Sequence, residues 1–517
     1  MAGESYQVDR AQAMIAGPVA SADWLIVVPV VLPIVCGALL LMFRHRMRIH
    51  AFMALAALAL VTGANASMLQ RVLADGPFSM TMGGWLPPFG ISFTADVLGV
   101  SFALVGSAVA FICCLYSLGD IDRTGRRYGF YAFLMLMMAG VNGAFLTGDM
   151  FNLYVWFEVF LISSFGLLIL GSDKAQIDGA VKYAILNLVA TTLFLIATGY
   201  VYGTFGTLNM ADLARKVDGL SDTAPLMTLS ALYLLAFCMK AAAFPVNFWL
   251  PASYHTPRIV TAALFGGLLT KIGIYALMRS MILIFAVERA AYSMPIAIVA
   301  GATMILGALG ALAQSDLRRM AGFLVISGVG VMLSGLALGS EGGLAGMAFY
   351  ALNSMVVMTA LYILAGAMGA AGAGFSLHDL GGLYRARPLL AAIAFLLILA
   401  AAALPPASGL WPKIVLVKAS LAEGAGWLAG AILVSGFLTT LALGRVFLLA
   451  FWRPASASLP IARVPSLSLA VLLLLLVPVL LVGLYPEPVI AMSGSAAKGL
   501  LDPSAYIQAV FPQAGGG

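Results

Sequence analysis

Four ionisable side chains lie inside long apolar stretches of the sequence, where they could bind and release protons. They are Glu158, Lys240, Lys271 and Lys413. A charge at the centre of a bilayer costs about 2.5 to 3.5 kcal/mol on insertion scales, so such a residue is a functional candidate by default. Burial favours the neutral forms of lysine and glutamate, whereas a nearby opposite charge favours the charged forms. A Glu158 to Lys240 pair that forms and breaks could therefore control whether Lys240 holds a proton.

Each of these residues also has a structural interpretation. Glu158 and Lys240 could form a static buried ion pair that only fixes helix packing. Lys271 and Lys413 could serve packing, or extend their amino groups toward the membrane surface.

Four further charged residues lie nearer the ends of apolar segments. We expect Lys418 and Arg279 to extend toward the outer interface. Asp96 and Asp149 lie where outer helix ends are expected, so we predict that they cap helix N-termini.

The elements that must position these residues follow from composition. The chain has 517 residues, of which 62% are hydrophobic and only 9% are charged. Soluble proteins carry roughly 25% charged residues, so a soluble protein is excluded. Apolar runs of about 20 residues, enough to cross a bilayer, recur throughout. We predict an all-α polytopic membrane protein with about fourteen transmembrane helices. The spans lie near 24–43, 50–70, 95–118, 128–147, 150–171, 179–203, 226–250, 258–286, 291–313, 319–339, 344–369, 388–423, 427–452 and 465–487.

Loop charges predict the orientation of these helices. Most lysines and arginines outside the spans follow odd-numbered helices, and basic loops are retained in the cytoplasm. Both termini should therefore lie outside. The first apolar segment lacks the basic start and cleavage site of a secretory signal, so we interpret it as a permanent helix. The net charge of +6 is scattered over short loops, which argues against nucleic-acid binding.

Nothing in the sequence indicates a cofactor or a metal. The four cysteines sit in apolar spans without metal or redox spacing, and the four histidines are widely separated. No phosphate-binding loop is present.

Two segments outside the spans have weaker patterns. A short amphipathic surface helix is predicted around 208–217. The tail after about residue 488 is rich in Ala, Gly and Pro, so we expect partial disorder and no function there.

Two of the spans are broken by proline in similar surroundings. The first reads AAAFP at 241–245 and the second AAALP at 401–405. Proline removes a backbone donor and breaks a helix at membrane depth. Paired broken helices indicate a transporter built from repeats, whereas two unrelated kinks are the alternative. Lys240 directly precedes the first break and Lys413 follows the second, which favours repeats.

Three long motifs resemble the D subunit of the Mrp multisubunit cation/proton antiporters. They are AGVNGAFLTGDMFNL at 139–153, continuing to FEV at 157–159, GGWLPPFGI at 83–91, and LLTKIGIYAL at 268–277. The resemblance extends over nearly the whole chain. The same superfamily contains the antiporter-like subunits of respiratory complex I and of membrane-bound hydrogenases.

The resemblance implies two inverted five-helix repeats, helices 4 to 8 and 9 to 13. The chain then divides into 1–127, 128–286, 287–452 and 453–517, with proline-broken helices 7 and 12. By position, Glu158 matches the fifth-helix glutamate, Lys240 the seventh-helix lysine, and Lys271 the central eighth-helix lysine. Lys413 matches the exit residue of helix 12, which is often glutamate in complex I subunits, so lysine favours the Mrp family.

The second half departs from the family pattern. Relatives often place histidine or lysine on helices 10 and 11, where this chain has Gly328, Asn353 and Met358. The link from Lys271 to Lys413 would then depend on water and on nearby hydroxyls, such as those of Ser327, Tyr350 and Ser354.

We therefore expect a non-enzymatic subunit of a Na+/proton antiporter in the bacterial inner membrane, working with other subunits and moving protons and Na+. The main alternative is a proton-pumping subunit of a redox complex, such as NADH-quinone oxidoreductase or a membrane-bound hydrogenase. Two further alternatives are a self-sufficient solute symporter and a pure scaffold.

Overall fold

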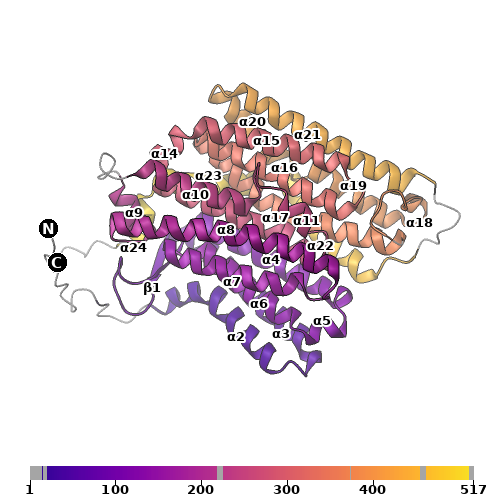
Figure 1. The fold of residues 1–517 in the computed structure, drawn as a ribbon, viewed down its shortest axis with the longest axis horizontal. Helices are drawn as coiled ribbons and strands as arrows, with labels where there is room; N and C mark the ends of the chain where they lie inside the picture. Colours follow the sequence, from indigo (N-terminus) through magenta and orange to yellow (C-terminus); the bar gives the residue numbers. More distant parts are fainter. Residues whose placement is uncertain (1–13, 15–19, 218–224, 373, 455–461, 512–517) are drawn as a thin grey trace.

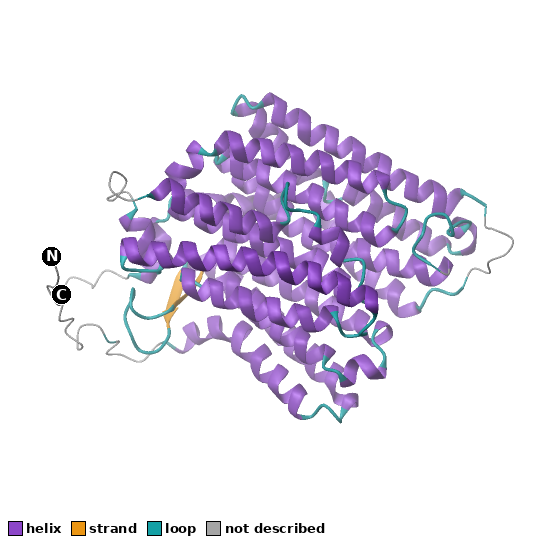
Figure 2. Ribbon diagram, in the orientation of Figure 1, coloured by secondary structure: helices purple, strands orange, loops and turns teal. Residues whose placement is uncertain are grey.

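The protein is a bundle of long, roughly parallel and antiparallel helices (Figures 1 and 2). The structure is a computed structural model that describes residues 14, 20–217, 225–372, 374–454 and 462–511. Among these residues, eleven helices are long and apolar enough to cross a membrane. Three shorter apolar helices, at Phe130–Leu146, Leu226–Ala241 and Pro388–Ala402, complete the predicted fourteen. The predicted polytopic fold is confirmed.

The N-terminal part contributes the first three spans. Its elements are the 3₁₀ segment η1 (Ser21–Val27), α2 (Val28–Met42), α3 (Met47–Asp75), the strands β1 (Phe78–Thr81) and β2 (Ser92–Ala95), α4 (Val97–Asp120) and α5 (Arg123–Arg127).

The next five spans carry three of the four candidate residues. Their elements are α6 (Phe130–Leu146), α7 (Met150–Leu168), α8 (Lys174–Phe205), α9 (Met210–Lys216), α10 (Leu226–Ala241), α11 (Trp249–Ser253), α12 (Ile259–Leu264), η3 (Phe265–Leu269), α13 (Thr270–Met278) and η4 (Arg279–Ile284). The predicted surface helix around 208–217 is α9.

The last six spans complete the bundle. Their elements are α14 (Ala286–Ala291), α15 (Ser293–Ala313), α16 (Leu317–Leu338), α17 (Glu341–Gly372), α18 (Leu383–Ala386), α19 (Pro388–Ala402), α20 (Leu410–Ala422), α21 (Gly426–Val446), η5 (Phe447–Trp452), α22 (Ser466–Leu484), α23 (Glu487–Leu501) and α24 (Ser504–Val510).

The eighth span is the centre of the bundle. It runs through α12, η3, α13 and η4 as one membrane-length helix, Ile259–Ile284, whose most apolar stretch is entirely buried by its neighbours. Both η3 and η4 are π-helical. A π turn leaves a local backbone carbonyl without its usual helical partner and often marks a functional site.

The two proline breaks have the same backbone geometry. Helix α10 ends at Ala241 and α19 at Ala402, and in each case the next alanine is left-handed, with φ +62° at Ala242 and +61° at Ala403. The following amide donates five residues back, from Ala243 to Cys238 at 2.9 Å and from Leu404 to Leu399 at 2.8 Å. The predicted helix breaks are confirmed. The two breaks match each other in backbone dihedral angle and in hydrogen bonding.

A two-stranded hairpin was not predicted. Strands β1 and β2 pair antiparallel, with Phe78 opposite Ala95. The ten residues between the strands contain Gly83, Gly84 and Gly90. Glycines between two short segments are typical of a hairpin loop and could have indicated it.

The expectation of a partly disordered tail after residue 488 is wrong as far as residue 511; residues 512–517 lie outside the described residues. Helix α23 packs against α17, and α24 packs against β1, β2 and α9. The buried side chains of α23 are Ser493, Ala496, Ala497 and Leu500. These residues lie on one face of the helix. The tail is rich in small residues, yet its sequence forms an amphipathic helix.

The described elements also separate the two ends of the bundle. The segments η1, β1, β2, α9 and α24 gather at one end, where η1 and α24 both contact β1 (Figure 1). Helices α5 and α18, which carry arginines, lie at the opposite end, which we call the basic end.

The left-handed alanines predict an unusual response to glycine. A left-handed residue other than glycine costs about 1 to 2 kcal/mol. Ala403→Gly should therefore raise the thermal unfolding temperature of the purified chain, because Ala403 is only half-buried and little packing is lost. The matched control is Ala401→Gly, two residues earlier inside α19, which should lower it, because glycine in a helix interior costs about 1 kcal/mol. Equal destabilisation by both variants would contradict the assigned geometry.

Candidate functional site

Lys271 lies on α13 in the middle of the buried eighth span. Its side chain is 0% exposed. The ammonium nitrogen Nζ donates to the carbonyl of Gly266 at 2.7 Å. Gly266 belongs to the π turn η3, which frees that carbonyl. A lysine held only by a neutral acceptor at this depth can exchange its proton more readily than one locked in an ion pair.

Lys240 is at the last turn of α10, next to the first helix break. It is 4% exposed, and Nζ has no hydrogen-bond partner among the described residues. Nζ lies 5.5 Å from the centre of the Phe157 ring. The half-buried Glu158 is the neighbouring residue on α7 and acts electrostatically on Lys240. In the described structure no ion pair within 4 Å joins the two, so the static-pair interpretation lacks its contact.

Lys413 lies on α20, beyond the second break. It is half-buried and lines a groove of about 600 Å³ between α19, α20 and α21. Its Nζ lies 3.3 Å from where a side chain on Gly436 would begin, so the glycine makes room for the amino group. Lys418, on the same helix, is exposed.

The predicted hydroxyl path between Lys271 and Lys413 is not continuous in the described residues. Ser327 donates to the carbonyl of Met304 at 2.9 Å. The ring of Tyr350 lies against Gly328, and Ser354 is buried. Within the part of the chain that the structure describes, no hydrogen bond joins any two of these three hydroxyls.

Sequence reasoning missed the polar contacts of the two breaks. The amide of Phe244 donates to the Thr303 hydroxyl at 3.0 Å. At the second break, the Ser408 hydroxyl donates to the side-chain oxygen of Asn353 at 2.5 Å. The sequence offered one indication of these contacts: Ser408 lies three residues after Pro405, close to the second break.

Asp96 and Asp149 cap helices as predicted. The Oδ1 of Asp96 accepts from the amide of Gly99 at 2.8 Å at the start of α4. The Oδ1 of Asp149 accepts from the amide of Asn152 at 2.7 Å at the start of α7, the helix that carries Glu158. Burial raises the pKa of Asp149 to about 6.

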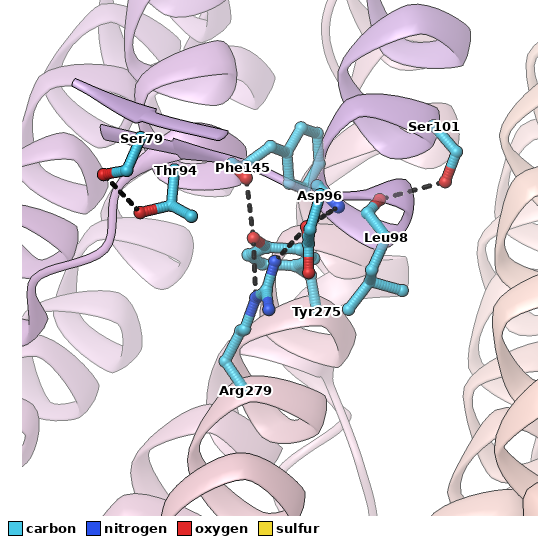
Figure 3. A network of polar contacts seen from close by, with 9 residues as sticks. Ser79, Thr94, Asp96, Leu98, Ser101, Phe145, Tyr275 and Arg279 are labelled. Atoms are coloured by element: carbon cyan, nitrogen blue, oxygen red, sulfur yellow. Dashed lines mark hydrogen bonds and ion pairs between the residues drawn. The ribbon is translucent and has the colours of Figure 1, made fainter. Parts of the chain in front are cut away.

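Arg279 does not extend to the interface, which corrects the prediction. It is 2% exposed, and Nη2 donates to Asp96 at 2.5 Å while Nε donates to the Tyr275 hydroxyl at 2.9 Å (Figure 3). Tyr275 in turn donates to the carbonyl of Phe145 at 2.6 Å. The ring of Tyr506, on α24, lies 5.2 Å from the guanidinium carbon. The buried carboxylate of Asp96 supplies the counter-charge of Arg279 inside the protein.

A polar cavity of about 640 Å³ is formed by loops after spans 5, 7 and 9. On its wall, Arg319 Nη2 contacts His255 Nε2 at 3.1 Å, and His255 Nδ1 contacts the carbonyl of Pro251 at 2.8 Å. Because guanidinium can only donate, Nε2 accepts and Nδ1 carries the hydrogen, so His255 is neutral. Burial and the positive charge of Arg319 both lower the pKa of His255.

The acid on the same wall stays charged. Burial would raise the pKa of Asp316, but the Arg318 guanidinium and backbone N–H groups outweigh it and lower that pKa. Among the described residues, no group of three or more His, Cys, Asp or Glu side chains could hold a metal ion.

Comparison with known proteins places the fold and the site in context. The NADH:quinone oxidoreductase/Mrp antiporter transmembrane family model matches residues 147–439. The D subunit of the Na(+)/H(+) antiporter of Alkalihalophilus pseudofirmus is 36% identical over 496 residues, covering 95% of this chain and 99% of the relative.

Two solved structures have a similar fold. A chain of the Mrp complex from Dietzia sp. DQ12-45-1b superposes with a TM-score of 0.89 at 28% identity, covering 95% of this chain and 100% of the other. A chain of respiratory complex I from Thermus thermophilus has a TM-score of 0.79 at 23% identity, covering 92% and 99%. The second likeness concerns the fold alone.

The Asp96 to Arg279 pair predicts a large loss of stability on neutralisation. Asp96→Asn keeps an N-cap, because asparagine caps as well as aspartate, but leaves Arg279 buried without its counter-charge. We expect a loss of about 3 to 5 kcal/mol in unfolding free energy, measured by denaturation of the purified chain. The matched control is Asp149→Asn, which also keeps a cap but removes no ion pair of the described structure, and should change stability by less than about 1 kcal/mol. Equal effects would mean that the caps, and not the ion pair, carry the stability.

Proposed function

The chain belongs to the NADH:quinone oxidoreductase/Mrp antiporter family, and from this premise we propose that its buried ionisable side chains conduct protons across the membrane. It is a multi-pass membrane protein and one of the subunits of a multisubunit cation/proton antiporter. The residues of the proposed relay are Glu158, Lys240, Lys271 and Lys413.

The observation that carries this proposal is the state of Lys271. This lysine is fully buried in the most enclosed helix and is held by one backbone carbonyl, and no ion pair with any described residue offsets the cost of its charge. Stability alone would favour an apolar residue at this depth. Proton transfer is the chemistry that a buried amine can perform without a cofactor.

The neighbouring groups support a relay in steps. Glu158 follows Phe157, whose ring centre is 5.5 Å from the Lys240 amino group, and we propose that a displacement of the Glu158 side chain forms an ion pair with Lys240. When the pair forms, Lys240 is stabilised as ammonium; when it breaks, the desolvated amine releases its proton. The proton then passes toward Lys271 and, by water and hydroxyls such as Ser327, Tyr350 and Ser354, toward Lys413.

The backbone supports two repeats, which we propose to lie at 128–286 and 287–452, flanked by 1–127 and 453–517. The matching left-handed alanines and hydrogen bonds at the two breaks favour this division over two unrelated kinks. We propose that the basic end faces the cytoplasm of a bacterial plasma membrane, which places the end with η1 and α24 outside.

We further propose that the cation is Na+, in line with the relatives named as D subunits of Na(+)/H(+) antiporters. Other subunits would complete its path, so the chain is a transporter component without enzymatic chemistry of its own. The redox-complex alternative is less supported, because the family includes both kinds of subunit but the likeness to the chain of complex I, at 23% identity, concerns the fold alone.

Two lysines on α20 offer a matched test of the relay. Lys413→Ala should lower proton-coupled Na+ transport by the assembled complex about a hundredfold, because it removes a transfer step. Lys418→Ala, the exposed control on the same helix, should transport normally. Transport is measured as Na+-dependent pH change in everted vesicles, with assembly checked by co-purification. Intact antiport in Lys413→Ala would remove this residue from the relay.

Glu158→Gln separates a relay from a static ion pair. Because no ion pair joins Glu158 to Lys240 within 4 Å, the substitution should leave assembly and thermal stability within about 1 kcal/mol of wild type. Antiport should fall about a hundredfold, since glutamine cannot take up a proton. A loss of several kcal/mol with normal turnover per assembled complex would instead favour the static pair.

A further inference from the structure

Three buried tyrosine hydroxyls outside the proposed relay have no hydrogen-bond partner among the described residues, and two of them lie near the π turn that holds Lys271. These two belong to Tyr254, between α11 and α12, and Tyr362, on α17, and both residues are 0% exposed. An unsatisfied buried hydroxyl costs about 1 to 3 kcal/mol, and such groups are usually satisfied by internal water. Both hydroxyls therefore mark positions where water can bind inside the protein.

Tyr362 reaches from Lys271 toward the polar cavity. Its ring lies directly against Gly266, where a side chain would collide with it, and the Gly266 carbonyl is the acceptor of Lys271. The hydroxyl at the other end of the ring lies against Gly322 on α16. Helix α16 also carries Arg318 and Arg319, about one helical turn before Gly322, and both line the cavity.

Tyr254 makes the same connection from the other side. It directly precedes His255, which lines the cavity. Its ring centre is 5.5 Å from that of Phe265, the neighbour of Gly266. Each of the two tyrosines thus lies between the cavity and the π turn that holds Lys271.

We propose that Tyr254 and Tyr362 form a water-assisted proton route from the cavity at the basic end to Lys271. This inference rests on the proposed function and adds the side from which Lys271 is reached. An excess proton enters on a water of the cavity. Each phenol accepts a proton from the protonated water on its cavity side and gives its own to a water on the Lys271 side, so the phenol and the first water are both neutral again. The last protonated water gives its excess proton to the neutral Lys271 amine and becomes neutral water, and the resulting ammonium donates to Gly266.

The chemistry of the cavity suits such a route. Asp316 is held in its charged form by Arg318, and His255 is neutral because Arg319 occupies its Nε2. The wall is therefore polar and retains water, while the arginines oppose free passage of other cations. A proton relayed through water and phenols passes where Na+ does not.

Removal of the two hydroxyls tests the route. Tyr254→Phe and Tyr362→Phe keep both rings, and with them the packing against Phe265 and Gly266. We expect the double variant to slow proton-coupled Na+ transport of the assembled complex about tenfold, with unchanged or slightly higher thermal stability. The matched control is Tyr131→Phe, which removes a buried hydroxyl bonded to Ser117 on α4 and should transport normally.

A sided measurement separates a relay from a packing role. In oriented vesicles, the variant should slow the response to a pH jump at the basic end more than to one at the opposite end. A packing defect would slow both equally, which would overturn the route.

A cysteine in the cavity wall provides a test that leaves the tyrosines in place. Ala313→Cys introduces an exposed thiol at the cavity. Treatment from the basic end with a quaternary-ammonium methanethiosulfonate should block transport relative to the same variant untreated, with treated wild type as the control for native cysteines. Transport that persists after complete labelling would overturn the route.

The outcomes also distinguish this inference from the proposed function. If the double phenylalanine variant transports like wild type while Lys271→Ala does not, the route is wrong and the relay stands. If Lys271→Ala also transports like wild type, the relay itself is wrong.

Discussion

The cost of an unpaired charge or an unpaired backbone group in hydrocarbon governs this structure. Arg279 meets that cost with a carboxylate, the two helix breaks meet it with local backbone hydrogen bonds, and the first break also uses the hydroxyl of Thr303. Lys240 and Lys271 meet it only partly. These two lysines have no ion pair in the described structure, so their protonation can change without dismantling the fold, and we expect them to do chemistry.

Features set by local sequence were predictable. Apolar runs located the spans, proline placed the breaks next to Ala241 and Ala402, and aspartates before apolar runs identified the caps at Asp96 and Asp149. The burial of Lys271 followed from its distance to both ends of its span. All of these features depend on hydropathy and local backbone geometry, which neighbouring residues in the sequence determine.

Features that depend on contacts between distant segments were not predictable. Asp96 and Arg279 are 183 residues apart, so nothing local paired them, and a snorkelling arginine was the reasonable expectation. The α23 face consists of small residues, whose burial has meaning only opposite α17. The residues of the π turn at Gly266 do not differ in type from those of an ordinary apolar helix, so the sequence did not predict it. This turn nevertheless provides the acceptor of Lys271.

The fold of the tail over the Asp96 to Arg279 pair has a consequence for biosynthesis. Helix α4, with Asp96 at its start, enters the membrane long before the eighth span, so the carboxylate is already in place when Arg279 follows. Tyr506 emerges near the end of synthesis and covers the pair last. Until then, the pair lies at an unfinished surface. A chain that ends before α24 would therefore lack the Tyr506 ring beside the ion pair, at the end opposite the basic one.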